Sequence, residues 1–445
     1  MRMSFQHFNL TAPLIKALDE LGFAQPTTIQ EKAFNVIMSG KDVCGIAQTG
    51  TGKTLAYLLP CMRMINYAKD RFPQMLVLVP TRELVQQVVD MAKSLNRYRN
   101  LEIIGVYGGV NMKPQAAAVL NGADIIVATP GRLYDLILSG AMRTKNIKKL
   151  VIDEMDELLN LGFRPQLRNI LDLLPGKRQN LLFSATITEE VEQLIDVYFT
   201  APERIEAAPA GTPLDKIKQL AYEVPNFYTK INLLRLLLQQ NADMTKVLVF
   251  VSVKRMADEV FENISAAFPE QFGVIHSNKE QNHRSQTVRS FHAGEYRGII
   301  ATDIVARGID VSDVSHVINF DLPDTPEHYI HRIGRTGRAD REGNAISFIT
   351  PSAQPQREAI EALMKLEIPL MPLPEDLLIS EQLTEDERPK ENLKEIKLKL
   401  PKRENVGPAF HPKSAKNSKV NVRVSHKDKM MAKYGKKKTR GAKKR

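Results

Sequence analysis

The sequence predicts an α/β fold built as two consecutive domains, each a mostly parallel sheet with helices on both faces. Short apolar runs rich in β-branched residues alternate with longer segments of helical period, and this series occurs twice along the chain. Runs that are apolar on both faces are typical of buried parallel strands, and their alternation with helices is typical of α/β domains. The length of 445 residues also exceeds that of one ordinary domain.

Eight apolar runs are the predicted strands. They lie at residues 76–79, 125–127, 150–152 and 181–183 in the first series, and at 247–251, 298–301, 316–320 and 345–349 in the second. Between the two series, residues 200–213 are rich in Ala, Pro and Gly and show no helical or strand period. We therefore place a linker at residues 208–215, between a first domain of residues 1–207 and a second of 216–370.

Residues 371–445 are expected to form a charged, basic and largely disordered tail, because they are rich in Pro and charge and poor in aromatics. Residues 391–445 contain 19 Lys and Arg against 4 Asp and Glu, a net charge of +15, whereas the preceding 390 residues carry −4. Such asymmetry indicates a tail that binds a polyanion. Two alternatives stay open: a solvated tail that only aids solubility, and a short amphipathic helix at residues 392–400.

Composition argues against several classes of protein. Two cysteines, Cys44 and Cys61, are too few for a disulfide framework or a zinc site, and their apolar neighbours predict buried, reduced side chains. The chain does not begin with a long apolar run, which argues against a signal peptide. No apolar stretch approaches 18 residues, so we expect no membrane span and a cytoplasmic protein.

A glycine-rich loop follows the apolar run at residues 43–46 and precedes a predicted helix. Such a loop presents backbone N–H groups to phosphate oxygens at a helix N-terminus. Lys53 is predicted to meet the β and γ phosphates of ATP, and Thr54 to hold Mg²⁺ through its hydroxyl. The strict P-loop pattern begins with Gly, and this loop begins with Ala47 instead. The nucleotide-binding residues predicted here are Ala47, Gln48, Thr49, Gly50, Thr51, Gly52, Lys53 and Thr54.

Acidic residues follow the buried run at residues 150–152. Carboxylates at the C-terminal end of a parallel strand face the crevice where ligands bind in such sheets. We predict that Asp153 holds Mg²⁺, partly through water, and that Glu154 orients and deprotonates the attacking water. A solvated acidic turn is the alternative.

Three arginines lie in residues 331–338 of the second domain. Guanidinium groups suit phosphate oxygens, so Arg335 and Arg338 can act as arginine fingers toward a nucleotide held by the first domain. An ordinary basic surface is the alternative. If they are fingers, the site is complete only when the two domains close.

In these motifs the sequence resembles the DEAD-box ATP-dependent RNA helicases, and the resemblance covers residues 5–350. It implies two RecA-like domains. Phe5 and residues 22–30 match the Q motif, which implies that Gln30 reads the adenine edge and that Phe23 packs near the ring. The resemblance also assigns Asp310 to the ATP ribose. The short termini and the lack of long accessory domains favour the bacterial, RhlE-like branch of this family.

The resemblance further implies RNA contacts and residues that couple hydrolysis to RNA. The RNA-contacting residues are Pro80, Thr81, Arg82, Gly109, Thr129, Pro130, Gly131 and Arg132 in the first domain, and Arg284 and Thr302 in the second. The coupling residues are Ser184, Thr186 and His331.

Two positions are unusual. The family's Asp-Glu-Ala-Asp is here Asp-Glu-Met-Asp, and Met155 is expected to adjust packing without changing the reaction. Pro60 falls inside the helix after the P-loop, where we expect it to kink the helix or end its regular part.

The predicted function is ATP-dependent closure of the two domains on single-stranded or structured RNA, with loss of adjacent base pairs and release on hydrolysis. Discrimination against DNA would come from 2′-OH contacts. A monomer working in ribosome assembly or RNA turnover is expected. The rival functions are a DNA-translocating motor and an inactive RNA-binding scaffold.

Overall fold

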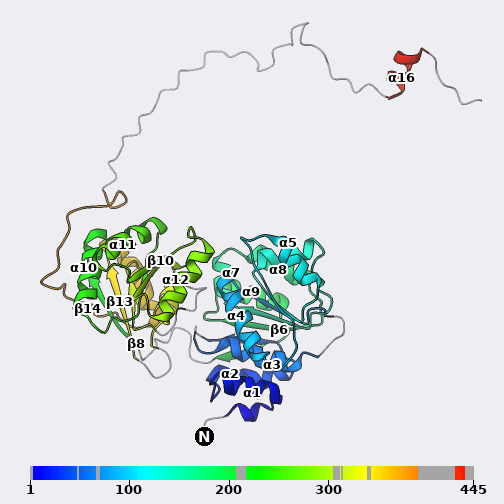
Figure 1. Cartoon of the computed structure of the whole chain (residues 1–445), viewed down its shortest axis with the longest axis horizontal. Helices are drawn as coiled ribbons and strands as arrows, with labels where there is room; N and C mark the ends of the chain where they lie inside the picture. The colour runs from blue at the N-terminus through cyan, green and yellow to red at the C-terminus, as the bar shows by residue number, and fades with distance from the viewer. Residues whose placement is uncertain are drawn as a thin grey trace, which may run out of the picture. The chain divides into compact units, whose positions relative to one another are not determined.

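The computed structural model describes residues 4–47, 50–66, 71–206, 217–303, 311, 314–337, 342–388 and 426–435. Two parallel α/β sheets form from residues 4–206, here called the first lobe, and residues 217–387, the second lobe (Figure 1). Within the described residues each sheet has seven strands, in the orders β3-β4-β2-β5-β6-β1-β7 and β10-β11-β9-β12-β13-β8-β14. Strand pairing is parallel in both sheets, as predicted.

The first lobe begins with helices and then alternates strands and helices. Its strands are β1 Val43–Ile46, β2 Met75–Leu78, β3 Ile103–Val106, β4 Ile125–Ala128, β5 Lys149–Asp153, β6 Gln179–Ser184 and β7 Glu203–Glu206. Its helices are η1 Phe5–Phe8, α1 Ala12–Glu20, α2 Thr28–Met38, α3 Lys53–Met64, α4 Arg82–Leu95, α5 Met112–Leu120, α6 Pro130–Leu138, α7 Met155–Asn160, α8 Arg164–Leu173 and α9 Glu189–Tyr198.

The second lobe repeats this alternation. Its strands are β8 Ile217–Glu223, β9 Val247–Phe250, β10 Phe272–Ile275, β11 Gly298–Ala301, β12 His316–Asn319, β13 Gly343–Ile349 and β14 Leu370–Met371. Its helices are α10 Phe227–Gln240, α11 Lys254–Ala267, α12 Gln281–Ala293, α14 Pro326–Ile333, η2 Pro351–Ala353 and α15 Gln354–Met364. All eight predicted strands are therefore present, β1 is the apolar run that precedes the P-loop, and the weaker runs that became β3, β7, β8, β10 and β14 were missed.

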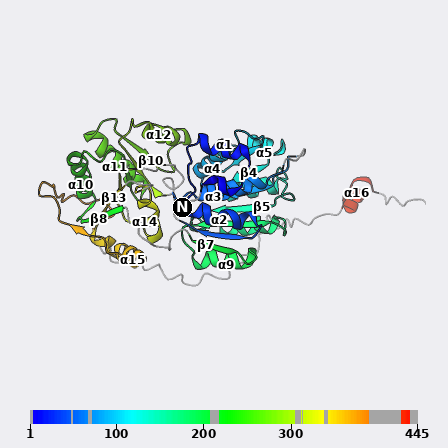
Figure 2. The same ribbon diagram turned by 90° about the horizontal axis from the view of Figure 1, so that it is seen from below.

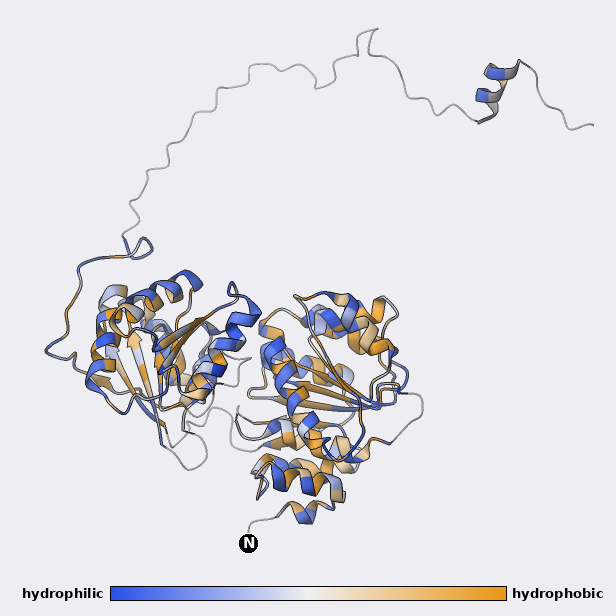
Figure 3. Cartoon of the chain, in the orientation of Figure 1, coloured by the Kyte–Doolittle hydropathy of each residue, from blue (hydrophilic) through white to orange (hydrophobic). Residues whose placement is uncertain are grey.

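Helices cover both faces of each sheet, and successive strand residues enter different cores. In the first lobe, α1 to α4 pack on the face that carries Val77 and Val151, whereas α5 to α9 pack on the face that carries Leu78 and Ile152. In the second lobe, α10 and α11 cover one face, and α12, α14 and α15 cover the other. Figure 2 shows the same ribbon turned by 90°, with helices on both sides of the strands in each lobe. Figure 3 shows that the strands are largely hydrophobic, whereas the helices carry many hydrophilic residues.

Pro60 lies inside helix α3, and both cysteines lie in the core of the first lobe. Helix α3 continues through Pro60 to Met64, so the expectation that Pro60 ends the regular helix is wrong. The helix is buried from Leu55 to Met62, and this packing offsets the backbone hydrogen bond that proline cannot donate. Cys44 and Cys61 are both fully buried and free, as predicted.

The folded part of the second lobe extends beyond residue 370, where the sequence placed the start of the tail. The backbone N–H of Phe227 donates to Glu387 Oε1 at 2.7 Å, and the Asn226 side chain donates to the Ser380 carbonyl. Leu373 and Leu377 pack against the core under α10. Residues 371–387 therefore belong to the second lobe. The polar and proline-rich composition of this segment predicted disorder. The composition does not show the few hydrogen bonds and apolar side chains that hold the segment on the lobe.

Residues 388–445 form a separate unit. One helix is described in it, α16 His426–Tyr434, which compositional reasoning missed. The predicted linker at 208–215 and the alternative helix at 392–400 lie outside the described residues. Among the residues that the structure describes, no helix is long and apolar enough to span a membrane.

Candidate ATP and RNA sites

The P-loop joins the end of β1 to the first residue of α3, and it packs against the Q motif. Gly50 and Gly52 have φ angles of 84° and 89°, a conformation that favours glycine. The Gln30 side chain is buried, donates to the Gly52 carbonyl at 3.1 Å and accepts from the Thr27 N–H at 3.0 Å. A Cβ atom on Gly52 would lie only 2.4 Å from Gln30 Nε2. The two predicted nucleotide-binding segments therefore form one unit.

Lys53 and Glu154 form a buried ion pair across the lobe. The Lys53 Nζ atom lies 2.8 Å from Glu154 Oε1. Burial alone would lower the pKa of Lys53, but the nearby carboxylates of Glu154, Asp153 and Asp156 raise it above its usual value. Glu154 has a left-handed backbone (φ 52°) at the turn from β5 into α7, which is uncommon for a residue with a side chain. That turn directs the acidic residues toward the P-loop lysine.

Asp153 is held at both carboxylate oxygens. Oδ1 accepts from the Glu154 N–H at 3.0 Å, and Oδ2 accepts from the Tyr57 hydroxyl at 3.0 Å. Burial raises the pKa of Asp153 to about 6, and the charge of Lys53 opposes that rise. Burial and the charge of Asp153 hold the pKa of Tyr57 well above its usual value, while a hydrogen bond with Thr54 acts in the opposite direction.

Asp156 joins the three predicted coupling residues, although sequence reasoning gave it no role. Its Oδ2 accepts from the Thr186 N–H at 3.1 Å and from the Thr186 hydroxyl at 3.0 Å, and its own N–H donates to Ser184 Oγ at 3.2 Å. His331 Nε2 of α14 lies 3.7 Å from the same Oδ2. Burial opposes ionisation, but the hydrogen bond and charge of His331, with Lys53 and Ser184, lower the pKa of Asp156.

The donor atoms of this region fit a small, hard cation. Glu154, Asp156 and His331 each place a possible ligand atom within 4.8 Å of the others, and Asp153 directly precedes Glu154 in the sequence. Mg²⁺ prefers carboxylate and hydroxyl oxygens and water, so the fit comes from the acidic residues and Thr54. The imidazole is better suited to its contact with Asp156.

Of the arginines in the second lobe, Arg332 has a structural role. Its Nε and Nη2 atoms donate to both carboxylate oxygens of Asp303, each at 2.6 Å. Arg335 is buried after the end of α14. Gln48, Thr49, Asp310 and Arg338, which the sequence also assigned to the nucleotide, lie outside the described residues.

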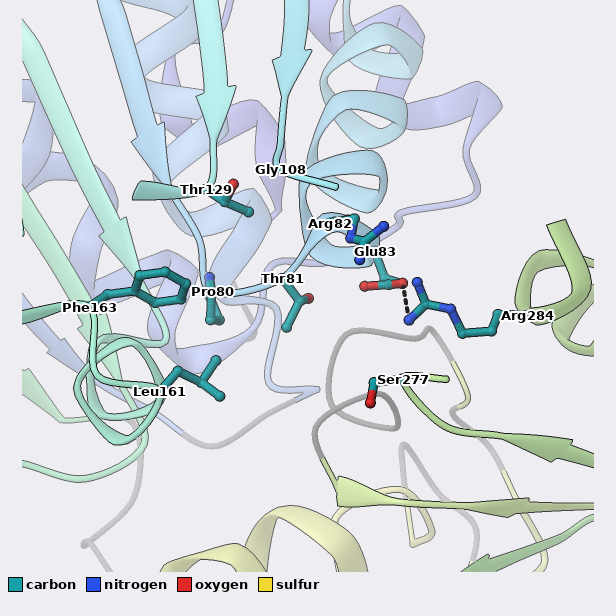
Figure 4. Close-up of a pocket in the computed structure, with 10 residues that line it drawn as sticks. All are labelled: Pro80, Thr81, Arg82, Glu83, Gly108, Thr129, Leu161, Phe163, Ser277 and Arg284. Carbon is teal, nitrogen blue, oxygen red and sulfur yellow. Dashed lines mark ion pairs between the residues drawn. The ribbon is translucent and has the colours of Figure 1, made fainter. Parts of the chain in front are cut away.

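A pocket of about 330 Å³ gathers many of the predicted RNA-contacting residues (Figure 4). Arg284 points toward Glu83, and Arg284 Nη1 lies 3.0 Å from Glu83 Oε1. Burial lowers the pKa of Arg284, and the charge of Glu83 opposes this. Sequence reasoning missed Leu161, Phe163 and Ser277. The lining residues are Pro80, Thr81, Arg82, Glu83, Gly108, Thr129, Leu161, Phe163, Ser277 and Arg284.

The remaining predicted RNA residues do not line this pocket. Arg132 is buried and donates to Gln115 Oε1 at 2.8 Å and to the Val110 carbonyl at 2.7 Å, so it holds the loop that contains Gly109. A Cβ atom on Gly109 would lie 2.8 Å from the Arg82 guanidinium, which packs over it. Pro130 and Gly131 begin α6, and Thr302 follows β11 and is buried.

Two further residues were predicted to bind the nucleotide. Phe23 is half-buried against the first core, and Ala47 donates its N–H to the Ser184 carbonyl.

Comparisons with known proteins settle the family. Residues 27–194 match the sequence model of the DEAD/DEAH box helicases, and residues 229–340 match that of the helicase conserved C-terminal domain. The DEAD-box ATP-dependent RNA helicase CshA of Bacillus subtilis (strain 168) is 37% identical over 84% of this chain and 75% of its own length. This chain is a DEAD-box ATP-dependent RNA helicase. The RNA helicase CrhR of Synechocystis is 36% identical over 83% of this chain and 75% of its own.

Solved structures agree with this DEAD-box assignment. Dbp5 of S. cerevisiae, bound to RNA and ADP BeF3, matches with a TM-score of 0.75 and 29% identity over 83% of this chain and 95% of that one. A DEAD box protein of Methanococcus jannaschii matches with a TM-score of 0.52 and 37% identity over 83% and 99%. The RecA-like character of both lobes is thereby confirmed, and this DEAD-box helicase is an RNA-dependent ATPase. Membership of the RhlE-like branch stays a prediction.

Proposed function

We propose that this helicase hydrolyses Mg²⁺-bound ATP at the Lys53, Asp153 and Glu154 cluster and binds RNA in the pocket between Thr81 and Arg284. The observation that supports this most strongly is the convergence of Ser184, Thr186 and His331 on Asp156. Those contacts join the sheet edge that carries the acidic cluster to α14 of the second lobe. Movement of the second lobe would thus change the contact between His331 and Asp156, close to the proposed catalytic residues.

Each residue of the ATP site has a proposed task. Gln30 and Phe23 bind the base, and the P-loop amides with Lys53 bind the phosphates. The phosphates compete with Glu154 for Lys53, so that nucleotide binding releases Glu154 to orient the attacking water. Mg²⁺, held by Asp153 and Thr54, supplies charge stabilisation for the transferring phosphoryl group. Arg335 and Arg338 add positive charge from the second lobe, and Asp310 binds the ribose.

The RNA pocket offers backbone amides, hydroxyls and guanidinium groups, which are the groups that bind a phosphodiester backbone. Thr81, Thr129 and Thr302 supply hydroxyls, and Arg82 and Arg284 supply charge. RNA phosphates would compete with Glu83 for Arg284. We propose that the strand is selected by backbone geometry and 2′-OH contacts, with little sequence preference.

The remaining parts of the proposal concern the context in which the enzyme works. We propose a cytoplasmic monomer that acts in ribosome assembly or RNA turnover. The tail of residues 391–445, with a net charge of +15, anchors the enzyme on structured RNA. The catalytic domains are residues 1–207 and a second domain that runs from residue 216 to about residue 387.

The test is the ATPase rate measured with RNA and with DNA strands of the same sequence. RNA should stimulate turnover and DNA should not. A matched RNA series with 2′-OMe or 2′-H sugars identifies the selective group. Equal stimulation by DNA would favour a DNA motor, and the absence of any RNA-stimulated hydrolysis would favour an RNA-binding scaffold. Lys53→Ala, which removes the phosphate-binding cation, is the negative control.

A further inference from the structure

Tyr57 lies beside the proposed ATP site, but it is not among the residues proposed to bind the nucleotide. It belongs to α3, four residues after Lys53 and three residues after Thr54, so its side chain neighbours each of theirs on the helix. The side chain is fully buried, and its hydroxyl donates to Asp153 Oδ2 at 3.0 Å. A buried tyrosine whose hydroxyl meets a buried carboxylate differs from a core residue chosen only to fill space.

The position of the Tyr57 ring is set by packing on the sheet. Its ring centroid lies 5.4 Å from that of Phe183, with the planes at 49°. Phe183 in turn lies over Gly45, its partner on β1, and a Cβ atom at Gly45 would come within 2.6 Å of the Phe183 ring. The glycine therefore makes room for Phe183, and Phe183 packs against the Tyr57 ring, whose hydroxyl reaches Asp153.

The hydroxyl completes the anchoring of Asp153. The Glu154 N–H donates to Oδ1 at 3.0 Å. Rotation about the Cβ–Cγ bond moves both oxygens together, so this single hydrogen bond restrains the carboxylate less than two would. With the Tyr57 bond in place, both oxygens are fixed in one orientation. Groups that hydrogen-bond a metal-binding side chain commonly set its orientation and strengthen metal binding.

We infer that Tyr57 is a positioning residue of the ATPase, whose hydroxyl orients the Asp153 carboxylate toward the Mg²⁺ of Mg²⁺-ATP. The inference rests on the proposed assignment of Asp153 to that cation. Tyr57 itself donates no atom to the nucleotide and takes no part in proton transfer. Its contribution is to the affinity for Mg²⁺ in the nucleotide complex, rather than to the turnover number at saturating Mg²⁺.

The test substitutes Tyr57→Phe in the full chain, which removes one oxygen atom and keeps the ring. The Mg²⁺ concentration for half-maximal RNA-stimulated ATPase should rise roughly threefold to tenfold, the scale of one buried hydrogen bond. The turnover number at saturating Mg²⁺ and the RNA concentration for half-maximal activity should stay within about twofold, because the reacting groups are untouched. An unchanged Mg²⁺ requirement would mean that Tyr57 only fills the core.

A second measurement needs no catalysis. The affinity for fluorescent ADP is compared with Mg²⁺ and with EDTA on the same sample, so that any loss of folded protein cancels in the ratio. The ratio of the two ADP affinities measures how much Mg²⁺ strengthens ADP binding. Tyr57→Phe should lower this ratio by about the same factor by which it raises the Mg²⁺ concentration for half-maximal ATPase. Tyr198→Phe is the matched control, because it removes another tyrosine-to-aspartate hydrogen bond of the first lobe, from Tyr198 to Asp172 at 2.8 Å. That control should behave like the wild type.

A double-mutant cycle with Asp153→Asn separates this inference from the proposed function. If Tyr57 acts through Asp153, then Tyr57→Phe should produce no further change in the Mg²⁺ ratio once Asp153 is asparagine. An Asp153→Asn variant with the wild-type ratio would overturn the Mg²⁺ assignment itself. A lowered ratio for Asp153→Asn together with a wild-type ratio for Tyr57→Phe would overturn the role of Tyr57 alone.

Discussion

Lys53 Nζ lies 2.8 Å from Glu154 Oε1, and the two side chains are only 5% and 13% exposed. The ammonium that is predicted to bind phosphates is therefore paired with the carboxylate that is predicted to activate water. A buried charge that loses its partner is strongly destabilised. We expect nucleotide phosphates to replace Glu154 as that partner, which would link the binding of ATP to the release of the proposed general base.

Glu154→Gln should lower single-turnover ATP hydrolysis by at least about 100-fold, the range of a positioned general base. Affinity for ATP should remain within a few-fold of the wild type or increase, because the phosphates no longer compete with a carboxylate for Lys53. Hydrolysis by rapid quench and binding of a fluorescent nucleotide measure the two effects. Glu190→Gln, at an exposed residue paired with Arg164, is the control. Hydrolysis within a few-fold of the wild type would remove Glu154 from this role.

Arg335→Ala and Arg338→Ala should each reduce RNA-stimulated hydrolysis by about 10³-fold or more, as expected for an arginine finger. Both residues lie outside the lobe that carries the P-loop. Arg357→Ala serves as the comparison, because Arg357 pairs with Glu361 on α15, away from the site. Turnover should be measured at saturating ATP and RNA. If Arg335→Ala retained normal turnover, assembly of the site from both lobes would be contradicted.

Met155→Ala should change stability more than chemistry. Met155 is fully buried in the core of the first lobe, so its truncation should lower the free energy of unfolding by about 2–5 kcal/mol. Met155→Leu, which keeps the volume, should lower it by less than about 1.5 kcal/mol. Urea unfolding gives both values. ATPase of the folded Met155→Ala protein should stay within several-fold of the wild type. A loss like that of Glu154→Gln would show that Met155 shapes the site directly.

The cysteines should be unreactive in the folded protein. Burial raises the pKa of Cys44 to about 11 and that of Cys61 to about 12. A raised thiol pKa favours the protonated form, so at pH 8 the reactive thiolate is on the order of 10⁻³ or less of each residue. Ellman's reagent at pH 8 should detect no fast thiol under native conditions and two per chain in guanidinium. Rapid reaction of a native thiol would contradict the burial.

Truncation after Lys390 tests the tail. The shortened protein should bind RNA more weakly at low salt and with a flatter salt dependence, since each lost contact to a single-stranded phosphate changes the slope of log K by about 0.7. Turnover at saturating RNA should change little, because the predicted catalytic residues all precede Ala339. Affinities of the full and truncated chains across a salt series decide the matter. Equal affinities with parallel slopes would leave solubility as the function of the tail.

Much of the fold followed from local patterns. Strands buried on both faces must be apolar throughout, so the runs at residues 76–79 and 247–251 were recognisable without any partner strand. Strand β14 and the segment to Glu387 were not recognisable in this way. Strand β14 has only two residues, both exposed. The segment from there to Glu387 is held by individual hydrogen bonds at the start of α10, such as the one from the Phe227 N–H to Glu387.

The sequence by itself determined the α/β class, the order of the motifs and the placement of Lys53, Asp153 and Glu154 where strands and helices meet. These features depend on residue types at short spacing, which a single chain displays directly. Only the tertiary structure decided that Asp156 joins Ser184, Thr186 and His331, that Glu83 pairs with Arg284, and that Tyr57 holds Asp153. Each of these contacts joins residues far apart in the chain. Hydrogen-bond and ion-pair partners are set by the packing of the sheets and helices, and no local pattern records them.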